Sequence, residues 1–159
     1  MDKLFDLTFF ANDEDYEEGF HIGLFTTQEE AESVAERYSK EVPGFKDYDC
    51  ISRVFAFPVI GGTDQTKQVY RILGWNTNEN LDEIDILISS CFANQDEAEK
   101  ALLLAKQRTP REEWALNCHT FGQCDWAEGF VRTSVDTRNH RLPAQSRGSA
   151  QSDVPRCLQ

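Results

Sequence analysis

The sequence predicts an α+β fold in which two β-β-α-β pseudo-repeats share one mostly antiparallel sheet or core. The first observation is a repeated segment: FTTQEEAESVAERYSKEVP begins at Phe25 and returns at Phe92 as FANQDEAEKALLLAKQRTP. The second is that strand-like stretches surround each copy in the same order. The third is composition, because 40% hydrophobic residues in a chain of 159 supply enough apolar surface for a buried core.

Each copy of the repeated segment predicts a short amphipathic helix. In the first copy Thr27 stands three positions before Glu30, which is the arrangement of a capping box, and the second copy has the same arrangement from Asn94. Apolar residues then recur at i, i+3, i+4 and i+7. A proline follows each copy at the same distance and should end both helices.

Strands are predicted on both sides of each helix, and both helices should cover one face of the sheet. A glycine- and threonine-containing stretch, 61–67, joins the halves. The last short stretch, 126–132, adds an edge strand or packs as a loop, with its Trp and Phe closing the core. The predicted strands are residues 3–10, 20–25, 51–59, 68–75, 84–92 and 114–122.

We therefore expect one duplicated α+β domain over residues 1–132, with repeat one at 1–60 and repeat two at 68–132. Residues 133–159 differ in composition: they are rich in Ser, Arg, Gln and Pro and lack apolar periodicity. Such a segment buries too little apolar surface to offset its ordering entropy, so it is predicted to be a flexible, disordered tail.

The charge of the chain is uneven. Its 28 acidic and 16 basic residues give a net charge of -12. Residues 1–130 hold 26 acidic and 11 basic residues, a net of -15, and residues 131–159 hold two acidic and five basic residues, a net of +3. A body of this charge repels phosphate backbones, which disfavours nucleic acid as a partner, and attracts basic proteins. The alternative is that the acidity serves only solubility.

Three features predict a cytoplasmic protein. The N-terminus, MDKLFDLTFF, lacks the apolar core and cleavage site of a signal peptide. No stretch approaches the ~18 consecutive apolar residues of a membrane span, so no membrane association is expected. The five cysteines are odd in number and lack a framework spacing, which favours free thiols in a reducing compartment.

Catalytic and metal-binding patterns are weak. The segment NCHTFGQCDW holds Cys118, His119 and Cys124, but its spacing is not that of a zinc site. On a strand, Cys118 and His119 would face opposite sides of the sheet. The chain has no phosphate-binding glycine loop and no nucleophile elbow. We expect no cofactor, no metal and no enzymatic activity, with a Cys118–His119 nucleophile pair as a minor alternative.

Two motifs carry a resemblance: GLFTTQEEAESVAERYSKEVPGF, and the later WAEGF at 126–130. Over residues 20–45 and 126–130 the chain is similar to small uncharacterised bacterial α+β domains, several of which resemble immunity proteins of bacterial toxin systems. This chain departs from the pattern by carrying two copies, with PGF only after the first helix and WAEGF only after the second. The resemblance implies a cytoplasmic binding protein without catalytic residues.

The leading hypothesis is a non-catalytic, acidic protein-binding domain that neutralises a basic toxin domain. Acid-rich turns would steer the partner, and aromatic residues beside them would supply the desolvated contact. The alternative is a small-molecule-binding or regulatory domain with its ligand in the cleft between the halves, and an open edge strand would also allow a homodimer. The predicted partner-binding residues are Asp13, Glu14, Asp15, Tyr16, Glu17, Glu18, Trp75, Asp82 and Glu83.

Overall fold

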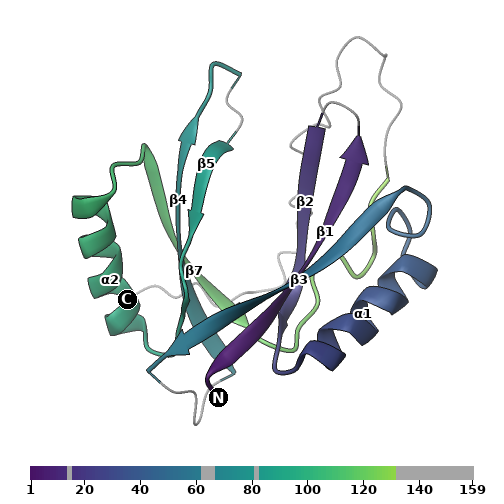
Figure 1. Cartoon of the computed structure of the whole chain (residues 1–159), viewed down its shortest axis with the longest axis horizontal. Helices are drawn as coiled ribbons and strands as arrows, with labels where there is room; N and C mark the ends of the chain where they lie inside the picture. The colour runs from purple at the N-terminus through teal and green to yellow at the C-terminus, as the bar shows by residue number, and fades with distance from the viewer. Residues whose placement is uncertain (14–15, 62–66, 81–82, 132–159) are drawn as a thin grey trace.

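The computed structural model describes residues 1–13, 16–61, 67–80 and 83–131. The first half contains β1 (Lys3–Asp13), β2 (Tyr16–Phe25), α1 (Gln28–Glu41) and β3 (Cys50–Ile60) (Figure 1). The second half contains β4 (Gln68–Thr77), β5 (Glu83–Ile88), β6 (Cys91–Phe92), α2 (Gln95–Arg108) and β7 (Glu113–Thr120). The α+β class is confirmed. The predicted tail, 133–159, lies outside the described residues.

The described strands form one seven-stranded sheet with the path β2-β1-β3-β6-β4, and β4 also pairs with β5 and β7. Tyr70 on β4 pairs with both β6 and β7, and Leu73 pairs with both β5 and β7. Because β7 occupies one side of β4, β5 and β6 both lie on the other side. Among the described strands only the β3–β6 pair is parallel, so the predicted mostly antiparallel sheet is confirmed.

The predicted strand 84–92 is two strands in the structure. The break falls at Ser89, whose hydroxyl accepts a hydrogen bond from the backbone N–H of Ile72 at 2.9 Å and donates one to the Ser90 carbonyl at 2.7 Å. The Ser89 hydroxyl thus accepts a hydrogen bond that a backbone carbonyl would accept in a continuous ladder. The element order in both halves is β-β-α-β apart from β6, and the structural equivalence of the halves stays a prediction.

Both helices begin at the predicted residues. The Thr27 hydroxyl accepts a hydrogen bond from the N–H of Glu30 at 3.1 Å, and the Asn94 side chain accepts from Asp96 at 2.8 Å. The reciprocal half of the capping box is shifted, because Glu30 accepts from the N–H of Thr26 rather than that of Thr27. These bonds satisfy N–H groups that have no partner inside the helix.

The two helices cover the same, outer face of the sheet. The buried face of α1, centred on Ala31 and Tyr38, packs on alternate residues of β1 such as Leu7. The buried Ala98 of α2 packs with Ile72 of β4. Figure 1 shows α1 and α2 on opposite sides of the molecule, with the strands between them. The sheet face opposite the helices is therefore turned inward.

The sheet curls until its two edges meet. After β7 the chain crosses to β2, where the N–H groups of Gly122 and Asp125 donate to the carbonyls of Leu24 and Ile22, both at 2.7 Å. Gly23 makes this approach feasible, because a Cβ there would lie 2.3 Å from the carbonyl oxygen of Gln123. Inside the curl, a buried apolar cluster forms the floor: Leu4, Leu24, Val69 and Cys91.

The two motifs of the resemblance contact each other. The N–H of Phe130 donates to the Pro43 carbonyl at 3.1 Å, and both Gly44 and Gly129 have positive φ, 84° and 78°. Trp126 and Phe130 pack against the core beneath α1, so the stretch from 126 is a loop that closes the core and not an edge strand. PGF and WAEGF, which each occur once, form the two sides of one contact.

Candidate functional site

The first predicted acidic turn lies at the tip of the β1–β2 hairpin. Asp13 is the last residue of β1, and Tyr16, Glu17 and Glu18 open β2. Glu14 and Asp15 lie outside the described residues.

The second predicted acidic turn lies at the tip of the β4–β5 hairpin. Glu83 is the exposed first residue of β5, whereas Asp82 lies outside the described residues. Trp75 is half-buried on β4. Figure 1 shows that both hairpins point to the same end of the molecule, so the fold brings the two acid-rich turns to one end although they are about 65 positions apart.

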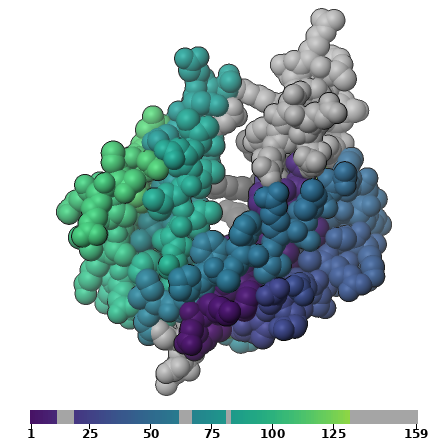
Figure 2. Space-filling model, viewed as in Figure 1, coloured from purple at the N-terminus to yellow at the C-terminus, as the bar shows by residue number. Residues whose placement is uncertain are grey.

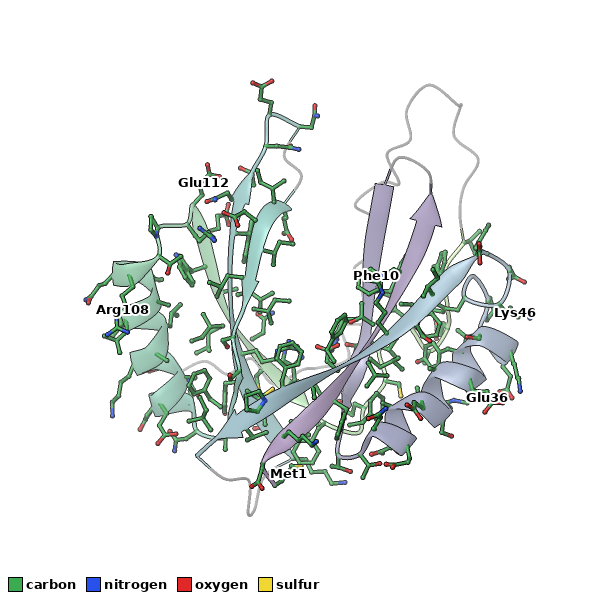
Figure 3. All side chains as sticks on the ribbon, in the orientation of Figure 1. Met1, Phe10, Glu36, Lys46, Arg108 and Glu112 are labelled. Atoms are coloured by element: carbon green, nitrogen blue, oxygen red, sulfur yellow. The ribbon has the colours of Figure 1, made fainter. Side chains whose placement is uncertain are left out.

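Further acids that the sequence analysis did not select stand beside the second turn. Glu112 accepts hydrogen bonds from the N–H and hydroxyl of Thr77 at 2.8 and 2.7 Å, and these bonds lower the pKa of its carboxyl (Figure 3). Asp85 pairs with Arg111 at 3.2 Å, and Glu79 and Glu113 are exposed. For Glu112 and Glu113 the only sequence signal is that two acids stand together shortly after Pro110, and no periodic pattern marks them as part of a site.

Below the acidic turns the strands expose large apolar side chains. Phe55 on β3 is 41% exposed, and Ile86 and Ile88 on β5 are 51% and 48% exposed. The β1–β3 register places Phe10 opposite Ile51 and Asp6 opposite Phe55, so all four share the inner face. Figure 2 shows the molecule hollowed between the strands of the two halves. We call this hollow the channel, with β3 and β5 as its walls.

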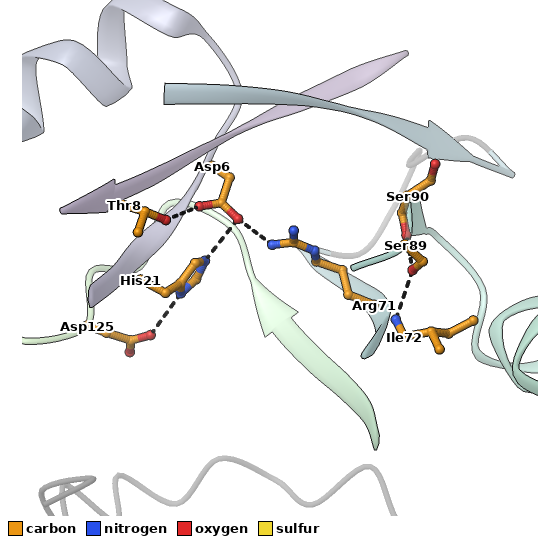
Figure 4. Close-up of polar contacts among 8 residues, drawn as sticks. All are labelled: Asp6, Thr8, His21, Arg71, Ile72, Ser89, Ser90 and Asp125. Carbon is orange, nitrogen blue, oxygen red and sulfur yellow. Dashed lines mark hydrogen bonds and ion pairs between the residues drawn. The ribbon is translucent and has the colours of Figure 1, made fainter. Parts of the chain in front are cut away.

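Deeper on the inner face, a polar cluster joins the two halves (Figure 4). The guanidinium of Arg71 on β4 donates to the carboxylate of Asp6 on β1, and both side chains are buried. The Thr8 hydroxyl donates to the same carboxylate at 2.9 Å. The Arg71 guanidinium also lies 4.2 Å from the centre of the Phe57 ring, which is a cation–π contact. We call this cluster the seam.

Two histidines complete the seam. The Nε2 and Nδ1 atoms of His21 lie 3.6 Å from Asp6 and 3.7 Å from Asp125, and the His21 ring centre lies 5.3 Å from that of His119. Burial, followed by the charges of His21 and Arg71, lowers the pKa of His119 to about 4. His119 is therefore neutral at pH 7. Sequence reasoning missed this pairing because 98 residues separate the two histidines.

The seam has little room for a ligand. The cavity beside the two histidines has a volume of about 110 Å³. A larger, open depression of about 510 Å³ lies on the outer face, between α1 and β3. His119 pairs with Val69 and Cys118 with Tyr70, so the two side chains point to opposite faces of β7, as the sequence predicts. Within the described ranges, no group of three or more His, Cys, Asp or Glu side chains could hold a metal ion.

The described cysteines, Cys50, Cys91, Cys118 and Cys124, are free thiols. Cys91 is buried, and burial raises the pKa of its thiol to about 11, which makes it a poor nucleophile. In the part of the chain that the structure describes, no helix combines the length and the apolar composition needed to cross a bilayer.

No protein-family model, curated protein or solved structure matches the chain. The function must therefore be inferred from the channel and the seam themselves.

Proposed function

We propose that the protein is a non-catalytic binding protein of the cytoplasm whose partner is a basic protein, such as a toxin domain that it neutralises. The observation that carries this proposal is that two acid-rich hairpin tips flank a channel with exposed apolar walls. If the halves are pseudo-repeats, each supplies one acidic hairpin.

The charge distribution supports a basic partner. Residues 1–130 carry a net charge of -15, and the β1–β2 and β4–β5 hairpins both point to the open end of the channel (Figure 1). Such a field concentrates cations and can raise association rates by roughly 10- to 1000-fold at low salt. Because the Debye length is about 8 Å at physiological ionic strength, this steering should weaken when salt is added.

The apolar walls support a macromolecular partner. Phe55, Ile86 and Ile88 form exposed apolar surface that water solvates poorly, and large exposed apolar patches mark interaction sites. Protein interfaces commonly have a polar rim around an apolar centre that loses its water on binding. The acidic hairpins and the apolar walls of the channel have this arrangement. A small-molecule ligand between the halves is less well supported, because the cavity at the seam, about 110 Å³, is below the roughly 300–1000 Å³ of typical ligand sites, and the depression of about 510 Å³ is open and lies on the outer face.

The test is the binding of a labelled basic peptide with alternating apolar residues, KVRIKVRI, to the full chain by fluorescence anisotropy. The double variant Glu17→Gln, Glu83→Gln removes one acid from each hairpin, and Glu41→Gln, Glu99→Gln removes two exposed acids from the helices as a matched control. We expect the hairpin variant to associate several-fold more slowly than the control variant, since steering acts at the channel mouth.

The same titration at 20 and 300 mM salt completes the test. We expect affinity to fall at least tenfold at the higher salt. Binding that ignores both salt and the hairpin acids would refute the proposed function in its electrostatic form. The natural partner can then be captured from lysate at low salt and measured with the same variants.

A further inference from the structure

One edge of β3 carries backbone groups that no described strand pairs with. The N–H of Val59 donates to the Asp2 carbonyl, on the β1 side, whereas the Ile60 carbonyl accepts from Ala93, on the β6 side. N–H and C=O groups of alternate residues point to alternate sides of a strand, so those of Ser52, Val54 and Ala56 point away from β1. Among the described strands, β6 pairs with β3 only at Val59 and Ile60, and none pairs with this edge above Pro58.

One edge of β5 is open in the same way. The N–H of Ser89 donates to the Ile72 carbonyl of β4, so the backbone groups of Ile88 point away from β4. Within the part of the chain that the structure describes, β5 pairs with β4 alone.

These two open edges border one gap. β5 and β6 lie on the same side of β4, and β6 joins β3 in parallel at Val59–Ile60. β3 and β5 therefore run in the same direction and diverge from that joint, as Figure 1 shows. Since neighbouring strands lie about 4.8 Å apart, an added strand can pair with both edges only near the joint, where they stand about 9.6 Å apart, and farther out it pairs with one edge alone.

We propose that the partner inserts one extended segment between β3 and β5, completing the sheet by strand addition. This inference rests on the proposed function and specifies how the basic partner binds. The segment's N–H and C=O groups pair with Ser52, Val54 and Ala56 of β3, and near the joint its other edge also pairs with Ile88 of β5. Alternate apolar side chains of the segment cover Phe55 and its neighbours inside the channel, and basic residues meet the hairpin acids.

The composition of the two edges supports this role. Natural proteins protect open edges with charges, prolines or a covering element. Pro58 protects the lower end of β3, and Glu83 and the bulge at Asp85 protect the upper end of β5, but the three isoleucines of EIDILI are each 44% or more exposed. A partly protected edge with high β-propensity is a liability unless a strand normally occupies it.

The chain's own residues 133–159 fit the gap less well than a partner segment does. They are basic, but Ser, Gln, Asn, Gly and Pro predominate over β-forming residues, and no run alternates apolar with polar side chains. A basic segment of a partner with alternating Val or Ile has both the charge and the pattern that the gap requires.

The experiment compares KVRIKVRI with the same peptide N-methylated at alternate amides, both titrated into the full chain. N-methylation removes hydrogen-bond donors on one edge and leaves the charges and side chains. We expect the methylated peptide to bind at least tenfold more weakly. On the protein side, Ala56→Pro removes one outward N–H of exposed β3 backbone, with Ala56→Ser as the matched control, and we expect only the proline variant to lose affinity.

Each outcome decides between the two proposals. Loss of affinity on methylation supports strand addition even if Ala56→Pro does not fold. Equal binding of both peptides, still weakened by salt, overturns strand addition and leaves the proposed function standing. Absence of binding by either peptide at low salt contradicts both. If a synthetic 133–159 peptide binds more tightly than KVRIKVRI, the chain's own residues fill the gap. If the protein forms a dimer that Ala56→Pro dissociates, a second copy fills it. Either result contradicts the proposal that a partner's segment binds there.

Discussion

At the scale of single residues, two glycines explain how the ends of the domain hold together. Gly129 has a φ of 78°, and a Cβ there would lie 2.0 Å from the carbonyl oxygen of Pro43. Gly122 has nearly the same backbone, with a φ of 79°, but no atom lies within 4 Å of its Cβ position. Comparing substitutions at the two positions therefore distinguishes the free-energy cost of the left-handed backbone from the cost of the contact with Pro43.

We predict that Gly129→Ala destabilises the protein far more than Gly122→Ala. Both substitutions incur roughly 1–2 kcal/mol for a left-handed residue with a Cβ. Only Gly129→Ala also pushes Pro43 away, which breaks the Phe130 hydrogen bond and overpacks the core at a further cost of about 1–3 kcal/mol. Urea unfolding of both variants measures the difference. Equal losses would show that the Pro43 contact adjusts freely and does not hold the loop.

At the scale of elements, capping side chains that can be recognised in the sequence determine where each helix begins. The Thr27 hydroxyl and the Asn94 amide each accept hydrogen bonds from N–H groups of the first turn. We predict that Thr27→Ala and Asn94→Ala each lower the free energy of unfolding by about 1 kcal/mol, and that Thr27→Ser changes it little. Thermal and urea unfolding provide the measurement. An unchanged Thr27→Ala variant would mean that packing of Tyr38 alone fixes the start of α1.

The same elements show what sequence can and cannot predict. Helix bounds and most strands follow from caps, periodicity and prolines, which act within a few residues. The break between β5 and β6 was not predicted, because it depends on a bond from Ser89 to the distant Ile72. The sequence analysis predicted two separate acidic turns and not that both hairpins point to one end, since their common direction comes from the curl of the sheet. The open edges of β3 and β5 were likewise not predicted, because they depend on which strands pair, and local sequence patterns do not show this.

At the scale of the whole molecule, the seam ties one half to the other. Asp6 and His21 come from the first two strands, Arg71 and His119 from β4 and β7, and Asp125 from the segment that closes the sheet. Buried ion pairs contribute little net stability, but removal of one partner typically costs about 3–5 kcal/mol because the other charge stays buried. The seam therefore links the stability of the two halves, and within it His119 is neutral at pH 7.

We predict that this protonation state makes the stability pH-dependent through His119. Its folded pKa, about 4, lies below the value of 6.5 for a free histidine, because burial and the charges of His21 and Arg71 outweigh the opposing carboxylates of Asp6 and Asp125. The neutral form is therefore favoured by folding. Its contribution is fully present above pH 6.5 and is lost as the pH falls toward 4, since the unfolded chain binds a proton there that the folded chain does not. The loss amounts to at most about 3 kcal/mol.

The measurement is urea unfolding at half-unit steps from pH 7.5 to 4 for the full chain and for His119→Gln. Groups distant from the seam titrate equally in both proteins, so the difference between the two curves reports His119 and its interactions with His21, Asp6 and Asp125. We expect the wild-type curve to fall more steeply between pH 6.5 and 4, with the two curves converging by about 2–3 kcal/mol. Parallel curves would mean that His119 is hydrated in the folded protein and that the seam opens to water without a change of fold.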